Sequence, residues 1–198
     1  QNTYFADRHV RRAIALSLDR DALTQAVTFG AAQTVKTLIP PTIQYAADVK
    51  ALDNDPAAAK EELAASAFPQ GFTATLLIAS GNSVRTQEAQ IIQEAVKPLG
   101  ITLKIESVEL NDFRERFFAY KFDAMINSGQ SDAPDPDGLI AFQTDPEGFS
   151  KSYWTHYTND RVTALAAQGR ATPDGEERAR IYAEIQQILA DDVPYIPL

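Results

Sequence analysis

The residues best suited to chemistry in this sequence are carboxylates in a stretch that lacks cations. From Phe122 to Ser150 there is no Lys or Arg, and the acids are Asp123, Asp132, Asp135, Asp137, Asp145 and Glu147. The stretch includes the end of a predicted strand, and α/β proteins bind ligands beyond the carboxyl ends of their strands. An acidic segment there suits a ligand with an ammonium or another positive group. A solvated acidic loop without a ligand explains the same composition equally well.

Catalytic and metal-binding patterns are weak elsewhere in the chain. No Gly-x-Ser-x-Gly motif is present, and the two histidines, His9 and His156, lack the spacing of metal ligands. A calcium loop fitted to 132–138 fails in register, because it places Ala133 at the first ligand and Thr144 at the closing carboxylate. The absence of Cys excludes thiol catalysis and Cys-based metal sites. We therefore expect no catalytic residue, no metal and no cofactor.

The chain is acidic and otherwise of ordinary globular composition. Its 198 residues include 18 Lys and Arg against 27 Asp and Glu, which gives a formal net charge of −9. Nucleic-acid binding needs a basic surface, so we expect no nucleic-acid partner. No apolar run approaches the ~20 residues that span a bilayer. Because Gln1 is not an initiator Met and Pro194–Leu198 is an extended apolar segment, we expect both ends to be truncated.

The elements that position the acidic stretch follow from hydrophobic spacing. The most regular part is a strand over 72–79, a helix that begins at Asn82 or Ser83, and a strand over 101–106. Such a βαβ unit has parallel strands and a right-handed crossover. A third strand is expected over Phe122–Asn127, after a short helix capped by Asn111.

Further helices surround this unit. They are expected to begin at Asp7, Asp19 and Asp55, whose side chains can cap them, and near the chain's end over 160–168 and 176–190. Between these parts the sequence is rich in Gly, Pro, Asp and Ser and predicts a loop with one helical turn. Together the elements predict an α/β fold, in a single domain over 1–198, with a mixed sheet and helices on both faces.

Short segments in a fixed order along nearly the whole chain carry a family resemblance. They are Phe5–Ala13 with Ser17–Arg20, Ile39–Pro41, Asp55–Pro56 with Ala59, Lys60 and Leu63, Leu99–Ile101, Asp132 with Asp135–Pro136, and Arg178, Tyr182, Gln186, Ile188–Leu189, Asp192 and Pro194–Leu198. In this order and spacing they resemble the family 5 (dipeptide, oligopeptide and nickel-type) extracytoplasmic solute-binding proteins of ABC importers.

The resemblance implies a fold, a role and partners. It implies the C-terminal lobe of a larger two-lobed protein with a type II periplasmic-binding-protein-like fold, whose lobes close on a ligand. The implied role is that of an importer receptor and not of an enzyme, in the periplasm or as a cell-surface lipoprotein. The implied partners are a small peptide or other small solute, the missing N-terminal lobe, and ABC permease subunits in the membrane.

The resemblance also implies which residues bind the ligand. Peptide-binding members line their cleft with a strand-to-loop segment that ends in an Asp, and here that segment is Ser128–Asp132. Asp132 would pair with the α-ammonium of a peptide. Backbone groups of Ser128 and Gln130 would pair with the extended peptide, as in β-strand addition.

The sequence departs from the family pattern at one position of this segment. Many relatives carry Trp where this chain has Gly129, so a stacking wall is missing, and a receptor for a metal chelate or a sugar stays open as an alternative. Trp154, the only Trp, stands in an aromatic run that either packs a loop onto the sheet or replaces this wall. Ser131 and Asn82 complete the candidate set.

A different class of function also stays open. Two of the carboxylates of Asp132, Asp135 and Asp137 would make a small carboxylate-dependent hydrolase if they lay about 5–10 Å apart around a substrate pocket. The prolines between these acids work against that geometry, and the family resemblance gives them no catalytic role.

Overall fold

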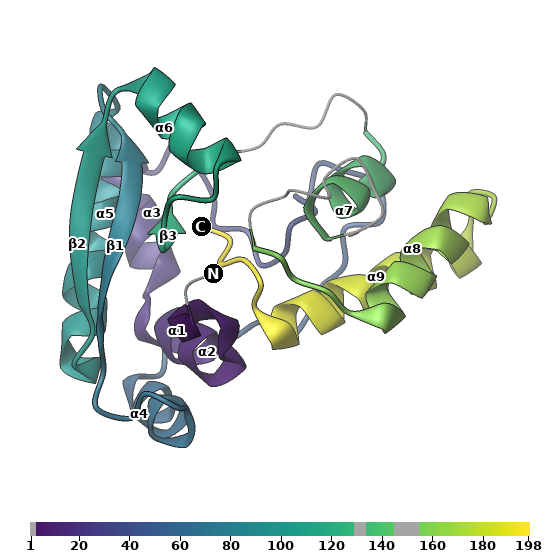
Figure 1. Ribbon diagram of the computed structural model, residues 1–198. Coiled ribbons are helices and arrows are strands. Elements are labelled where there is room, and N and C mark those ends of the chain that lie inside the picture. The colour runs from purple at the N-terminus through teal and green to yellow at the C-terminus, as the bar shows by residue number, and fades with distance from the viewer. Residues whose placement is uncertain (1–2, 129–133, 145–154) are drawn as a thin grey trace. The chain divides into compact units, whose positions relative to one another are not determined.

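The computed structural model describes residues 3–128, 134–144 and 155–198, and Figure 1 shows its helices and strands. Their bounds are α1 (Thr3–Ala6), α2 (Arg8–Ser17), α3 (Arg20–Thr28), α4 (Pro56–Ala65), β1 (Thr73–Ala79), α5 (Ser83–Val96), the 3-10 helix η1 (Lys97–Leu99), β2 (Thr102–Val108), α6 (Leu110–Phe118), β3 (Ala124–Met125), α7 (Pro136–Thr144), α8 (Asp160–Ala171) and α9 (Glu176–Asp192). The α/β class predicted from the sequence is confirmed.

The chain forms two compact units. The first unit comprises Gln1–Thr34, Leu52–Ser128 and Leu198, and the second comprises Val35–Ala51 and Gly129–Pro197. The first unit contains the sheet, and in the described part of the second unit the regular elements are helices. The expectation that the whole chain acts as one domain stays a prediction.

The sheet of the first unit has β1 at its centre, in the order β2-β1-β3. Thr73 lies opposite Thr102 and Ala79 opposite Val108, so β1 and β2 pair in parallel along their whole length. The predicted βαβ unit is therefore confirmed as β1, α5 and β2. Every strand pair among the described residues is parallel, where a mixed sheet was expected. Each connection between these strands contains a helix, and such crossovers return the next strand in the same direction.

The third strand is shorter than the predicted Phe122–Asn127. It pairs with β1 only at Ala124 and Met125. Just before it, the carboxylate of Asp123 accepts hydrogen bonds from the backbone N and Oγ1 of Thr75, at 2.8 and 3.0 Å. The Asp123 side chain thus accepts the bond from Thr75 N that a backbone carbonyl of the third strand would accept, and the strand begins only after this point.

Helices cover both faces of the sheet, as predicted. Leu77 and Ala79 of β1 contact Phe113 of α6. Because side chains alternate along a strand, Leu76 and Ile78 face the other side. There α5 lies against β1 and β2 (Figure 1).

Local side-chain contacts fix where several helices begin. Asp7, Asp19 and Asp55 each accept a hydrogen bond from a backbone N–H in the first turn of α2, α3 and α4, as the sequence predicted. The cap of α6 was predicted wrongly. Glu109, and not Asn111, is the N-cap, and its carboxylate accepts from the backbone N of Asn111 at 3.0 Å. Asn111 therefore does not cap the helix; its own backbone N–H donates to the Glu109 carboxylate that does.

The second unit packs α7, α8 and α9 around one apolar cluster. Its buried members are Ile39, Ile140, Val162, Leu165, Ala166, Ile181, Tyr182, Ile185 and Leu189. The loop predicted with one helical turn contains the longer helix α7. The segment Pro194–Leu198 forms no helix or strand, and Tyr195 and Ile196 are half-buried.

Candidate ligand-binding site

The candidate set falls largely outside the described part of the chain. Five of its members lie outside the described residues: Gly129, Gln130, Ser131, Asp132 and Trp154. Asn82 and Ser128 lie within them. The role of all seven residues in ligand binding stays a prediction.

Asn82 and Ser128 come together at the carboxyl edge of the sheet. Asn82 follows β1 and Ser128 follows β3, and these parallel strands are neighbours. The Oδ1 of Asn82 accepts from the backbone N of Arg85 at 3.0 Å and caps α5. The Nη2 of Arg85 donates to the Oγ of Ser128 at 2.7 Å. One arginine therefore links the two loops.

Arg85 is a candidate functional residue that the sequence reasoning missed. It is half-buried in the first turn of α5, where the helix dipole adds positive potential. Burial raises the pKa of Glu88, one turn later, against the opposing charge of Arg85. A guanidinium in this place can bind a carboxylate or another acceptor of a ligand. The sequence did contain a signal: Arg85 stands in the first turn of a helix that Asn82 caps and that follows a strand.

The acid Asp135 is paired with a cation that comes from far along the sequence. Its carboxylate accepts from both terminal nitrogens of Arg178 in α9, at 2.9 and 3.0 Å. The hydrogen bonds from Arg178 hold the pKa of Asp135 below its usual value, against the opposing effect of burial. The stretch from Phe122 to Ser150 has no cation of its own, but Asp135 is not left without one. The sequence analysis did not predict this pairing, because Arg178 lies outside the acidic stretch.

Asp137 lies in a different environment two residues later. Burial raises the pKa of its carboxyl group, against the charge of Arg170, whose Nε lies 3.8 Å from Oδ1. The hydroxyl of Tyr182 donates to the same oxygen over 3.4 Å, and burial raises the pKa of that hydroxyl to about 12. The two neighbouring carboxyl groups thus shift in opposite directions.

Two further features can be examined over all the described residues: clusters of metal-ligating side chains and helices able to span a membrane. Among the residues that the structure describes, no group of three or more His, Cys, Asp or Glu is placed to hold a metal ion. Within the same ranges, no helix combines the length and the apolar character needed to cross a membrane.

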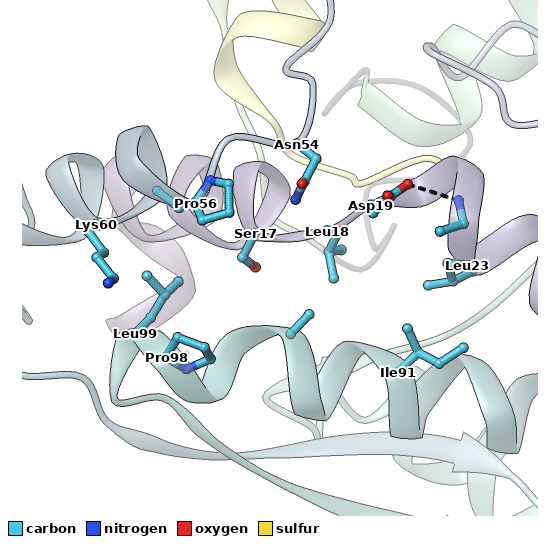
Figure 2. A pocket seen from close by; sticks show the side chains of 13 residues that line it. Ser17, Leu18, Asp19, Leu23, Asn54, Pro56, Lys60, Ile91, Pro98 and Leu99 are labelled. Atoms are coloured by element: carbon cyan, nitrogen blue, oxygen red, sulfur yellow. Dashed lines mark hydrogen bonds between the residues drawn. The ribbon is translucent and has the colours of Figure 1, made fainter.

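A separate cavity of about 460 Å³ lies within the first unit (Figure 2). It is lined by Ser17, Leu18, Asp19, Ala22, Leu23, Asn54, Pro56, Ala59, Lys60, Ile91, Ala95, Pro98 and Leu99. Figure 2 shows Lys60 at one end and Asp19 at the other, with the Asp19 carboxylate bonded to the backbone N of Ala22. Neither Asn82 nor Ser128 lines this cavity, so it is distinct from the sheet edge.

The family is decided by a match to the model of bacterial extracellular solute-binding proteins, family 5 (middle part), over residues 1–151. The chain belongs to this family. Family 5 is a family of solute-binding receptors, and the resemblance inferred from the sequence is confirmed.

Individual relatives match nearly the whole chain. Heme-binding protein A of Haemophilus influenzae is 27% identical over 199 residues, which cover 98% of this chain and 36% of that protein. Glutathione-binding protein GsiB of Escherichia coli is 28% identical over 207 residues, which cover 98% and 39%. The chain therefore spans well under half the length of these relatives.

A solved structure shows the same fold. The periplasmic binding protein DppA from Helicobacter pylori, in complex with the peptide STSA, matches with a TM-score of 0.92 and 26% identity, over 99% of this chain and 39% of that chain. The structural neighbours confirm the expected periplasmic-binding-protein fold.

Proposed function

We propose that this chain is part of the substrate-binding receptor of an ABC importer. It contributes half of a cleft that binds a peptide or a similar small solute and delivers it to the membrane permease. The observation that carries the proposal is the match over 99% of the chain to a binding protein in complex with a peptide. Receptors of this kind bind their ligand and release it unchanged, so the proposed function is not that of an enzyme.

The rest of the cleft would come from the same protein. Because the chain covers 36% and 39% of two relatives, a complete family member has length enough for a second lobe. Two-lobed receptors bury a ligand by closing around it. We propose an N-terminal lobe and ABC permease subunits as partners, and the periplasm or the cell surface, through a lipid anchor, as the location.

The proposed ligand contacts lie in and beside the segment Ser128–Asp132. Asp132 would accept from the ammonium of the ligand, and the backbone of Ser128 and Gln130 would pair with an extended chain. Arg85, which already contacts Ser128, would add a positive group at the sheet edge. Support comes from the sequence pattern and from the meeting of Asn82 and Ser128 at that edge.

The contacts of Asp135 count against a hydrolase. Both of its carboxylate oxygens accept from Arg178, and Oδ1 also accepts from the backbone N of Asp137 at 2.8 Å. A carboxylate held in this way and kept ionised is a poor proton donor.

The ligand class is tested on the full-length protein that carries this chain. Native mass spectrometry would identify a co-purified ligand, and calorimetry would compare the peptide Ser-Thr-Ser-Ala, glutathione and heme. We expect peptide binding at micromolar or tighter dissociation constants, and millimolar or no binding by the 198-residue chain alone, because a closing cleft buries most of its ligand between two lobes. Equal micromolar binding by the isolated chain would contradict the half-cleft.

The ammonium contact is tested by Asp132→Asn together with N-acetylation of the peptide. A charge-assisted hydrogen bond contributes roughly 1.5–3 kcal/mol, so either change should weaken binding by about 10- to 150-fold. The two losses should not add, since both remove one contact. Fully additive losses would show that Asp132 does not meet the ammonium.

A further inference from the structure

The cavity of the first unit has an apolar wall that follows α5 and η1 (Figure 2). The lining residues on that side, from Ile91 to Leu99, are all apolar, and eight helical steps of about 1.5 Å give the wall a length of about 12 Å. Leu18 and Leu23, which line the opposite side, are buried. The volume of about 460 Å³ is that of a small-molecule site, and the walls favour a ligand with an apolar body.

The two ends of this cavity carry opposite charges. Figure 2 shows Lys60 of α4 at the end beside Leu99, and Asp19, the N-cap of α3, at the end beside Leu23. The Lys60 side chain is exposed, and no described residue forms a hydrogen bond or an ion pair with its ammonium group. A carboxylate of a ligand would give this cation a partner.

The opposite end offers hydrogen-bond acceptors. Asp19 caps α3 with Oδ1, which accepts from the backbone N of Ala22 at 2.9 Å, and its Oδ2 has no partner among the described residues. Asn54, which also lines the cavity, donates through Nδ2 to the carbonyl oxygen of Leu16 at 3.2 Å and keeps its own Oδ1 as an acceptor. These oxygens suit the ammonium and amide N–H groups of a ligand.

The length of the apolar wall indicates the size of a ligand that meets both ends. An extended peptide spans at most about 3.3–3.6 Å per residue, so three residues span about 10–11 Å. This length is close to that of the wall. A fatty acid would satisfy only the cation of the cavity, and a simple amine only its carboxylate.

We propose that this cavity is a second binding site, and that it takes a short linear zwitterion with an apolar body, of the size of a tripeptide. Lys60 binds the carboxylate of the ligand, Asp19 binds its ammonium group, and the wall along α5 covers its apolar side chains. The site uses none of the residues at the sheet edge, so it does not depend on the proposed function.

The test follows the methyl NMR signals of Ile91 and Leu99 in the full-length protein during titration with the peptide Ala-Leu-Ala. Both side chains line the cavity, so their shifts report on it even if the peptide also binds elsewhere. We expect saturating shifts with a dissociation constant below about 1 mM. Ala95→Phe, which fills the cavity from the apolar wall, should abolish them. The proposal is wrong if no shift occurs up to about 10 mM peptide, or if Ala95→Phe leaves the shifts unchanged.

Asp19→Asn and Lys60→Gln test the two charged ends. Because Asn is as good an N-cap as Asp, Asp19→Asn removes the charge and preserves the start of α3. Each variant should bind Ala-Leu-Ala at least about 3-fold more weakly at low salt. The matched controls are Asp7→Asn, at the cap of α2, and Lys104→Gln, in β2. Neither residue lines the cavity, and both controls should bind as the parent does.

Modified peptides identify which end of the ligand each charge meets. N-acetyl-Ala-Leu-Ala lacks the ammonium group, so it should bind more weakly to the parent and lose nothing further in Asp19→Asn. The C-terminal amide of Ala-Leu-Ala should show the same relation to Lys60→Gln. Additive losses in either pair would overturn the proposal. So would octanoate, a monocarboxylate, if it shifted the Ile91 and Leu99 signals with an affinity equal to that of the peptide.

Discussion

The first unit packs its sheet with apolar side chains, whereas the second unit also buries polar ones. Among the described residues, the buried polar or charged side chains are Thr24 in the first unit and Thr37, Thr144, Arg178 and Gln186 in the second. Gln186 accepts from Thr37 and from the backbone N of Ala47 at 3.0 Å, and donates to the carbonyl oxygens of Tyr45 and Tyr182 at 2.9 Å. It thereby ties the segment 35–51 to α9.

Apolar contacts and buried polar contacts differ in how precisely they fix the position of the segments they join. Apolar burial is nondirectional, and in the first unit it packs helices onto the paired strands. The second unit has no described sheet that could impose a register, so directional bonds hold its segments. The boundary between the two units falls after Ser128, the first residue of the segment proposed to bind the ligand.

The largest expected effect is that of removing the buried cation. Arg178→Met should lower the free energy of unfolding by about 3–5 kcal/mol, because it removes the cation, with its hydrogen bonds, from two carboxylates and from the carbonyl of Gly169. Urea unfolding of the 198-residue chain measures it. Arg180→Met, on the solvated side of α9, should change it by no more than about 1 kcal/mol. Similar losses in both variants would break the comparison between the units.

The matching change in the first unit is apolar. Leu77→Ala removes a side chain that is 1% exposed in the middle of the sheet and should cost about 2–5 kcal/mol. Val84→Ala, at an exposed position of α5, should stay within about 0.5 kcal/mol. The same urea experiment applies. A small effect of Leu77→Ala would mean that burial does not dominate this unit.

Two glycines of the first unit separate close packing from backbone conformation. Gly71 and Gly81 both have positive φ, near +80°, but a Cβ at Gly71 would lie 2.2 Å from the carbonyl oxygen of Gly100, while none of the described atoms comes within 4 Å of one at Gly81. Gly71→Ala should cost about 2–4 kcal/mol and Gly81→Ala about 1–2 kcal/mol. Equal melting temperatures would show that the backbone contact relaxes freely.

The smallest effect is a pH dependence in the second unit. The pKa of Asp135 is lower in the folded chain than in the unfolded chain, where it is about 3.9. Ionised Asp135 therefore stabilises the fold at pH values above about 3.9, and this contribution is lost as the pH falls through the folded pKa. The raised pKa of Asp137 does the reverse, since its ionisation opposes folding at neutral pH and protonation relieves this.

At pH 7, Asp135→Asn should therefore destabilise the chain and Asp137→Asn should leave it unchanged or stabilise it, each by about 1 kcal/mol or less, because both groups are partly exposed. Thermal unfolding between pH 2 and 7 measures both. The effect of Asp135→Asn should shrink toward pH 2, and an effect that stays constant with pH would contradict the ion pair.

Much of the first unit could be predicted because its determinants are local. Asp7, Asp19, Asp55 and Asn82 cap helices within three residues of themselves, and the β-forming residues of β1 and the alternating residues of β2 mark these two strands. The error at the third strand arose from a contact between Asp123 and Thr75, which stand far apart in the sequence. A pattern within one segment carries no information on such a partner.

The candidate site was likewise predicted only where its determinants are local in the sequence. The order of short segments along nearly the whole chain identified the family, and the strand expected over Phe122–Asn127 placed the segment Ser128–Asp132 after a strand. Arg85 was missed because its contact with Ser128 depends on two loops meeting at the sheet edge. The pairing of Asp135 was missed because Arg178 stands in another helix.

The sequence by itself determined most of the helices and strands, the α/β class and the family, since periodicity, capping and motif order all act along the chain. Only the tertiary structure decided which charges are neutralised. Ion pairs and buried polar contacts form between segments that the fold brings together, so the acidic stretch looked free of cations until α9 placed Arg178 against Asp135. Directional contacts of this kind depend on the position of both partners, and a sequence specifies those positions only through the completed fold.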